Sequence, residues 1–152
     1  MKDDKKLATN KQIRANYEIL ETFEAGVKLT GPEVKSAKEG KINLKTSYAI
    51  IGSDLIVYLI GCNIAPYKPA YSIQTNYDPS KSRILLLNKK QIKSLFGKLK
   101  EKRLSLVPLN TYSNKGIIKF ELALVRGKKQ FEKRDSIKKR DIERDVGRKL
   151  RR

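Results

Sequence analysis

The first long pattern in the chain is an alternation of apolar and polar side chains over residues 17–30. Apolar residues at every second position from 23 to 29 share one face of an extended chain, whereas Glu24 and Lys28 share the other. Side chains of a β-strand alternate between its two faces, so this segment is predicted to be a long, half-buried strand. Gly26 within it predicts a bend or a bulge.

Short apolar segments between turn residues predict further strands in the same way. Pro108 has no backbone N–H, so the strand that contains it is expected at a sheet edge or at a bulge. The Asn-Lys-Gly sequence at 114–116 predicts a hairpin turn between the last two strands. The five additional strands are predicted at residues 44–51, 55–60, 84–87, 104–112 and 118–124.

Two short helices are predicted between the strands. Pro32 favours the first position of a helix and Gly40 favours its end, which predicts a helix over residues 32–39. Asn88 is a candidate N-cap for a second helix over residues 89–102, in which apolar residues recur at helical spacing.

The remaining segments carry weaker patterns. Residues 1–8 are polar and expected to be loose, a helical turn is expected to reach about Arg14, and residues 63–82 are expected to form a long loop. Together the elements predict a mainly β fold, a six-stranded antiparallel barrel with short flanking helices. An open sheet packed on two helices fits the pattern equally well.

The net charge of the chain indicates what kind of partner it binds. The 152 residues are 39% apolar and carry a formal net charge of +19. Of this charge, residues 1–125 contribute +11 and residues 126–152 contribute +8, so both parts are basic. A polyanionic partner follows, with nucleic acid ahead of an anionic membrane, since the tail has no wide apolar face. The tail is helix-capable, and a solvated basic tail that only aids solubility is an equally open interpretation.

The composition also excludes several kinds of chemistry. The chain has no histidine and only one cysteine, Cys62, which excludes an internal disulfide, a Cys-rich zinc site and Ser-His or Cys-His catalysis. No phosphate-binding glycine loop or nucleophile motif is present. We therefore expect no enzyme activity, no cofactor and no metal. The N-terminus has no apolar signal region and the run at 55–60 is too short to span a bilayer, so a cytoplasmic protein is expected.

Basic residues near the first helix and the fourth strand are the first candidates for contacts with phosphate groups, although ordinary surface lysines give the same pattern. Glu24 is more specific, because a carboxylate on a cationic surface can accept from a base amino group or a 2′-hydroxyl. The alternative for Glu24 is an ion pair with a neighbouring lysine. The residues chosen from this pattern are Lys11, Arg14, Lys35, Lys41, Arg83 and Lys89.

An ordered series of short motifs resembles a known family. Residues 23–26 read FEAG, and the series continues with GPEVKS, GKINL, NIAP, RILLLN, GKK and KRDSIKKRD, the last at 133–141. The series extends from about Asn10 to Asp141 and is similar to the SsrA-binding proteins, also called small protein B.

The resemblance implies an OB-like barrel that binds the tRNA-like domain of transfer-messenger RNA and no catalytic activity. It implies that this complex enters stalled ribosomes for trans-translation, with the tail in the decoding centre, against small-subunit ribosomal RNA, and in the message channel. A monomer without membrane contact is expected. It also implies two domains: a barrel at residues 1–125, and a tail at residues 126–152 that is disordered when free and helical on the ribosome.

The resemblance also assigns residues. Asn10, Glu24 and Leu86 match family positions tied to RNA binding, and burial preference predicts that Leu86 supports this surface from the core. Glu132 stands where the family usually has Asp, and Ile84 where it usually has Lys. The tail positions implied are Lys128, Lys129, Glu132, Lys133, Arg134, Lys138, Lys139 and Arg140.

Two other functions are compatible with the barrel pattern. One is a general OB-type ribosomal or translation-initiation protein, against which the GPEVKS and tail motifs argue. The other is a histidine-free RNA-processing enzyme, which a turnover assay on labelled RNA would reveal.

Overall fold

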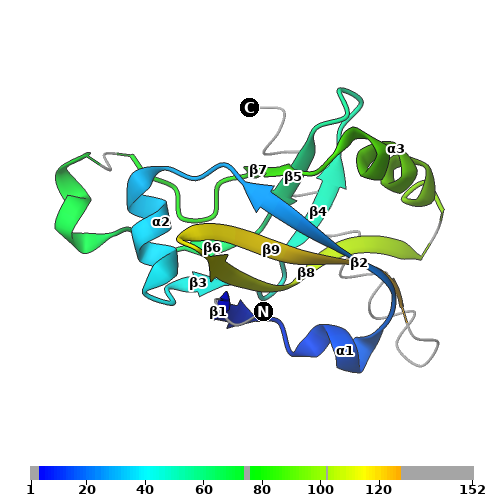
Figure 1. Cartoon of the computed structure of the whole chain (residues 1–152), viewed down its shortest axis with the longest axis horizontal. Helices are drawn as coiled ribbons and strands as arrows, with labels where there is room; N and C mark the ends of the chain where they lie inside the picture. The colour runs from blue at the N-terminus through cyan, green and yellow to red at the C-terminus, as the bar shows by residue number, and fades with distance from the viewer. Residues whose placement is uncertain (1–3, 74–75, 102, 128–152) are drawn as a thin grey trace.

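The computed structural model describes residues 4–73, 76–101 and 103–127. All tail residues implied as ribosome contacts, from Lys128 to Arg140, lie outside the described residues. The described chain forms one β-barrel with helices on its outside (Figure 1).

The sheet closes into a barrel because β8, near one end of the strand order, pairs with β9 at the other end. The seven-stranded sheet has the order β1-β8-β4-β5-β7-β2-β9, and β8 pairs in addition with β9. This pairing produces a ring of six antiparallel strands, with β1 added beside β8. The OB-like barrel is therefore confirmed, and the open sheet is wrong. The strands of the large sheet are β1 (Asp4–Thr9), β2 (Tyr17–Val27), β4 (Tyr48–Ile51), β5 (Val57–Ile60), β7 (Arg83–Leu86), β8 (Leu104–Asn114) and β9 (Ile117–Gly127).

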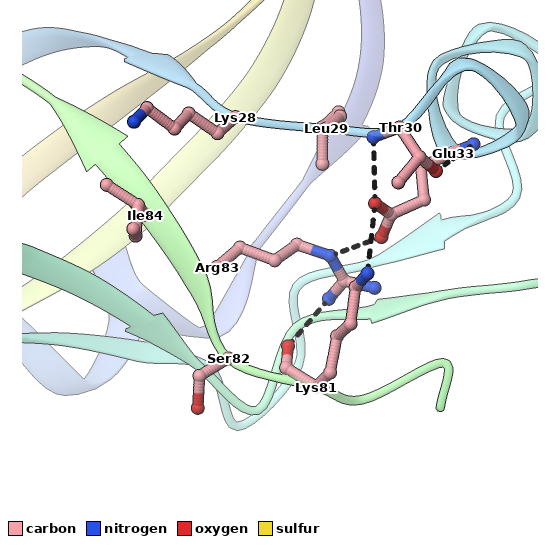
Figure 2. Close-up of a pocket in the computed structure, with 8 residues that line it drawn as sticks. All are labelled: Lys28, Leu29, Thr30, Glu33, Lys81, Ser82, Arg83 and Ile84. Carbon is pink, nitrogen blue, oxygen red and sulfur yellow. Dashed lines mark hydrogen bonds and ion pairs between the residues drawn. The ribbon is translucent and has the colours of Figure 1, made fainter. Parts of the chain in front are cut away.

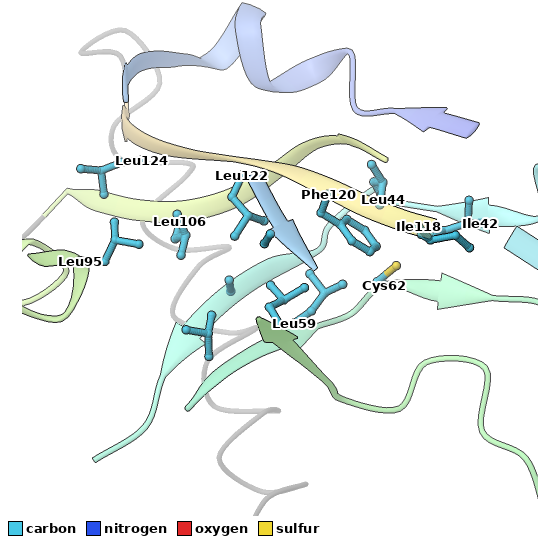
Figure 3. Close-up of a cluster of buried hydrophobic side chains, with 14 of the residues drawn as sticks. Ile42, Leu44, Leu59, Cys62, Leu95, Leu106, Ile118, Phe120, Leu122 and Leu124 are labelled. Carbon is cyan, nitrogen blue, oxygen red and sulfur yellow. The ribbon is translucent and has the colours of Figure 1, made fainter. Parts of the chain in front are cut away.

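The six strands of the ring are those that apolar alternation and short apolar segments predicted. Their inward side chains form one core around Phe120, which is fully buried between Leu44 and Leu59 and their neighbours (Figure 3). The predicted hairpin turn is confirmed, since Lys115 has a φ of 50° and Gly116 a φ of 83°, as a type I′ turn requires.

Short elements complete the barrel. A two-stranded sheet pairs β3 (Ile42–Asn43) with β6 (Asn63–Ile64). Leu95 of α3 is fully buried in the core, and Lys98 of the same helix lies 2.5 Å from Glu21 of β2. The helices are α1 (Gln12–Asn16), α2 (Gly31–Lys38), α3 (Lys89–Lys98) and a 3-10 helix at Lys68–Ile73.

The GPEVKS motif at residues 31–36 forms the first turns of α2. Thr30 accepts a hydrogen bond from the Glu33 backbone N–H at 3.3 Å, and Glu33 accepts from the Thr30 N–H at 3.0 Å, which is a complete capping box. Pro32 occupies the first turn, and Gly40 follows the helix with a φ of 80°, as predicted. Ser36 is fully buried and donates to the carbonyl oxygen of Ala65 at 2.6 Å, which fixes α2 against the next segment of chain.

Several sequence predictions are wrong in detail. Residues 4–9 are not loose: they form β1, whose backbone pairs with β8. The irregularity in β2 lies between Ile19 and Glu21 and not at Gly26, whereas the bulge expected at Pro108 is present between Pro108 and Asn110. The predicted strand at 44–51 is reduced to β4, and α3 ends at Lys98 rather than at 102. Among the described residues, no helix is long and apolar enough to cross a membrane.

Candidate nucleic-acid interface

Glu24 lies on the outer face of the barrel in a contact that joins three strands. Its carboxylate accepts a hydrogen bond from the Tyr112 hydroxyl of β8 at 2.5 Å and from the Lys119 ammonium of β9 at 2.7 Å. The Glu24 side chain nevertheless stays 54% exposed, and that of Lys119 32% exposed. The alternative that Glu24 pairs with a neighbouring lysine is therefore confirmed, and the carboxylate is still open to a ligand.

The two donors determine the charge state of Glu24. The hydrogen bond from Lys119, followed by that from Tyr112, holds the pKa of Glu24 below its ordinary value. Glu24 is therefore ionised at neutral pH, and its orientation is set by two side chains from different strands. A fixed, exposed carboxylate beside one lysine can accept hydrogen bonds selectively and adds no bulk affinity for phosphate.

Leu86 is the unexpected member of the same surface. It is 48% exposed, so the prediction that it belongs to the core is wrong. Leu86 pairs in register with Gly26 of β2, and a side chain built at Gly26 would lie 3.5 Å from Leu86 Cβ. Gly26 pairs on its other side with Lys119. We name this band across β7, β2, β9 and β8 the outer stripe: Leu86, Gly26, Glu24, Lys119 and Tyr112.

The residues predicted at the first turn serve partly as structure. The Asn10 side-chain amide donates to the Leu44 carbonyl oxygen at 3.2 Å, and its backbone N–H donates to the Leu109 carbonyl oxygen at 2.7 Å. Asn10 thus holds the end of β1 against two other segments. Lys11 and Arg14 are exposed at α1.

Three predicted lysines are exposed on the helices or beside them. The Lys35 ammonium lies 5.6 Å from the centre of the Tyr67 ring, and the Lys41 ammonium lies 3.4 Å from a carboxylate oxygen of Glu39. Lys89 is the first residue of α3. The structure does not gather these lysines around Glu24, and each is accessible to a phosphate group.

Arg83 lies inside the protein and not on its surface. Its side chain is only 1% exposed, so the prediction that it contacts RNA phosphates is wrong. Its Nε donates to Glu33 Oε2 at 2.7 Å, and its Nη1 donates to the carbonyl oxygen of Lys81 (Figure 2). Nη1 also donates to the Cys62 carbonyl, and Nη2 donates to the Pro79 carbonyl and the Tyr77 hydroxyl. All five guanidinium N–H donors are satisfied inside the protein.

Arg83 therefore forms a buried cluster that sequence reasoning missed. Burial by itself raises the pKa of Glu33, but the backbone hydrogen bond from Thr30 and the contacts with Arg83 outweigh it, and the pKa lies below its ordinary value. Burial also raises the pKa of the Tyr77 hydroxyl to about 12, so this group stays protonated. The T-x-x-E spacing at 30–33 signals a capping box, but nothing local signals a partner 50 residues later.

The described residues contain no group of three or more side chains that could hold a metal ion. The outer stripe offers charges, hydrogen bonds and one exposed apolar side chain. These are the elements of a surface that positions a polyanion and distinguishes part of it.

Comparisons with known proteins lead to a single family. The family model described as SmpB protein matches residues 7–152. An SsrA-binding protein of Sulfurihydrogenibium sp. (strain YO3AOP1) is 48% identical over 143 residues, covering 94% of this chain and 92% of that protein. An SsrA-binding protein of Persephonella marina is 45% identical over 145 residues, covering 95% and 93%.

A solved structure is similar as well. It is described as "tmRNA-SmpB: a journey to the center of the bacterial ribosome". One of its chains superposes with a TM-score of 0.66 and 46% identity, covering 80% of this chain and 84% of that chain.

Proposed function

The chain belongs to the family of SsrA-binding proteins, SmpB, and from this premise we propose how its own residues perform the family's work. The protein binds the tRNA-like domain of transfer-messenger RNA and delivers this RNA to stalled ribosomes for trans-translation. The RNA and the ribosome are its partners. Because ribosomes act in the cytoplasm, we propose that the protein acts there too.

The outer stripe is the observation that supports our assignment of RNA-binding residues. It combines an exposed leucine, a glycine that keeps the surface low between strands, and an ionised carboxylate held by Lys119 and Tyr112. Apolar contact with an unstacked base and hydrogen bonds to a base edge or a 2′-hydroxyl are how proteins recognise folded RNA. We assign the stripe to the tRNA-like domain, with Lys11, Arg14, Lys35, Lys41 and Lys89 as phosphate contacts around it.

The tail has a separate role in this proposal. Residues 128–152 occupy the decoding centre and the message channel, with Lys133 and Arg134 as the most specific contacts. Around them we place Glu132 and the basic residues Lys128, Lys129, Lys138, Lys139 and Arg140. We draw the boundary between barrel and tail after Gly127, two residues later than the sequence indicated, because β9 includes Gly127 and pairs it with Tyr17.

We propose further that the protein acts by binding alone, as a monomer without a cofactor. No step of delivery requires a bond to be made or broken by the protein. Labelled transfer-messenger RNA incubated with the protein should stay intact, and turnover would support the alternative of an RNA-processing enzyme.

The RNA that co-purifies with the protein from its own cells tests the proposed function. Transfer-messenger RNA should be the main species, well above its share of total RNA. Enrichment of ribosomal RNA alone would favour a general OB-type ribosomal protein, and enrichment of no RNA would contradict both assignments.

Binding to transfer-messenger RNA should weaken steeply with salt. Each phosphate group neutralised by Lys or Arg releases a counterion, so the logarithm of the affinity falls with a slope of about −0.9 per contact. Six or more contacts predict a loss of roughly 10³-fold between 50 and 200 mM salt. Filter binding over this range measures the slope, and salt-insensitive binding would contradict the phosphate contacts.

Leu86→Ala should weaken binding without unfolding the protein. Because Leu86 is about half exposed, we expect a stability change within about 0.5 kcal/mol, as for most surface substitutions. A contact at the centre of the interface should cost more than about 1 kcal/mol of binding energy, roughly a fivefold or larger loss. Ile117→Ala is the matched control, since Ile117 is 61% exposed at the far end of the β8–β9 hairpin. If both substitutions weaken binding equally, Leu86 does not lie in the interface.

A further inference from the structure

Beside the outer stripe lies a hollow that the proposed contacts do not use. It has a volume of about 340 Å³, the lower end of the range for ligand pockets. The hollow lies between the end of β2, the start of α2 and the start of β7 (Figure 2). Its lining residues are Lys28, Leu29, Thr30, Glu33, Lys81, Ser82, Arg83 and Ile84.

The hollow continues the stripe along the same face. The Lys28 N–H donates to the Ile84 carbonyl oxygen at 3.0 Å, two positions along from the register pair of Gly26 with Leu86. Side chains two positions apart on a strand point to the same side, so Lys28 follows Gly26 and Ile84 precedes Leu86 on the outer surface. A strand of RNA lying on the stripe would therefore reach the hollow without changing face.

The charge of the hollow favours an anion. Three cations, Lys28, Lys81 and Arg83, stand against the single carboxylate of Glu33, which leaves an excess of two positive charges. Arg83 is committed to Glu33, and Lys81 lies 3.5 Å from Glu33 with 40% of its side chain exposed. Lys28 is exposed and makes no ion pair or side-chain hydrogen bond with any described residue. The two lysines are thus the cations that can reach a ligand.

The walls of the hollow combine apolar side chains with hydroxyl groups, which suits the nucleoside that lies between two phosphate groups of an RNA strand. Leu29 and Ile84 are partly exposed apolar side chains within the lining, and Thr30 and Ser82 add exposed hydroxyl groups. In Figure 2 Lys28 and Lys81 lie on opposite sides of the hollow, with Ile84 near Lys28. The buried Glu33–Arg83 pair forms a rigid floor that does not have to rearrange when a ligand enters.

We propose that this hollow binds one nucleotide of the RNA strand, with its flanking phosphate groups on Lys28 and Lys81 and its nucleoside against Leu29 and Ile84. The inference rests on the proposed function, because the strand is that of transfer-messenger RNA on the outer stripe. It extends the footprint of the barrel from the stripe to α2.

Lys28→Ala in the full chain measures the phosphate contact. A slope of about −0.9 per phosphate makes one contact worth roughly eightfold in affinity at 0.1 M salt, and its loss should reduce the salt slope by about one. Lys93→Ala is the control, because Lys93 is exposed on α3 and alanine is a good helix former. If the two substitutions change slope and affinity equally, Lys28 belongs to the general basic surface and the proposal is wrong.

A tethered cross-linker locates the nucleotide. Cys62 is fully buried, and burial raises the pKa of its thiol to about 12, so a cysteine introduced at the exposed Ser82 can be labelled selectively. Ser82→Cys carrying a photo-cross-linker should modify one short site in transfer-messenger RNA, whereas Ser53→Cys, on the β4–β5 turn, should not. Scattered or absent cross-links from residue 82, with wild-type binding intact, would overturn the hollow alone. Failure of the unmodified protein to bind this RNA would instead overturn the proposed function.

Discussion

Removing residues 128–152 is expected to abolish the tagging of stalled nascent chains while transfer-messenger RNA still binds. The outer stripe and the hollow both lie within the barrel, so the cut leaves the proposed contacts with the tRNA-like domain intact. The tail contributes most of a +8 segment, and its loss removes the proposed contacts with the decoding centre and message channel. Tagging in a reconstituted translation system, programmed with a message that lacks a stop codon, should fall to the level seen without the protein.

The position of the cut matters. Gly127 pairs with Tyr17, and Arg126 pairs with both Glu18 and Leu104, so a cut after Val125 would take two residues out of the barrel. A cut after Gly127 should change the free energy of unfolding by less than about 0.5 kcal/mol, as measured in urea.

A full-length control separates specific tail contacts from bulk charge. Lys133→Gln combined with Arg134→Gln keeps the length of the tail and most of its positive charge, and it should reduce tagging more than the same pair of substitutions at Lys138 and Lys139. A truncated protein that tags at the normal rate would show that the assigned role of the tail is wrong.

Alternation and short apolar segments between turns were enough to find every strand of the ring, because each strand contributes buried side chains to the same core. Val57 and Leu59 of β5 are fully buried, as their spacing by two requires. The sequence pattern did not predict β1. This strand lies beside the ring and is held mainly by backbone pairing with β8, so Lys5 and Lys6 can remain exposed. Local patterns record burial, so an element that buries little leaves a weak signal.

The two errors at β7 share one physical cause. In Arg-Ile-Leu-Leu at 83–86, three consecutive apolar residues hide which face is inward, and charge suggests that Arg83 points outward. The structure has the opposite parity: Arg83 and Leu85 are buried and Leu86 is exposed. A partner 50 residues away in sequence makes the burial of Arg83 possible, and no local pattern reveals Glu33 as that partner.

The interface was predictable only in part for a related reason. Strand parity placed Glu24 on the outer face, where it is found. Its donors Tyr112 and Lys119 come from β8 and β9, and which residues meet there depends on the register of three strands. Sequence alone gives the face of a strand far more readily than its register.

Replacing Arg83 with methionine should destabilise the barrel far more than a surface substitution such as Leu86→Ala. Arg83→Met keeps much of the buried volume but leaves the Glu33 carboxylate in the interior, with only Lys81 at 3.5 Å as a cation. Removing one partner of a buried ion pair typically costs about 3–5 kcal/mol, a large part of the stability of a small domain. Urea unfolding at pH 7 measures this loss, and a cost below about 1 kcal/mol would contradict the assigned role of the pair.

The dependence of that cost on pH separates lost charge pairing from lost packing. In the wild type the pKa of Glu33 is depressed, so its contribution to stability is present above its ordinary pKa, about 4.5, and is lost as pH falls. Without Arg83, burial should raise the pKa of Glu33, and folding then favours the protonated carboxyl. The difference in unfolding free energy between wild type and Arg83→Met should therefore shrink between pH 7 and pH 4.5. Adding Glu33→Gln to Arg83→Met should recover part of the loss at pH 7 and flatten this dependence, because the amide carries no charge to desolvate. A cost that is the same at both pH values would assign the effect of Arg83 to packing and loop hydrogen bonds instead of its charge.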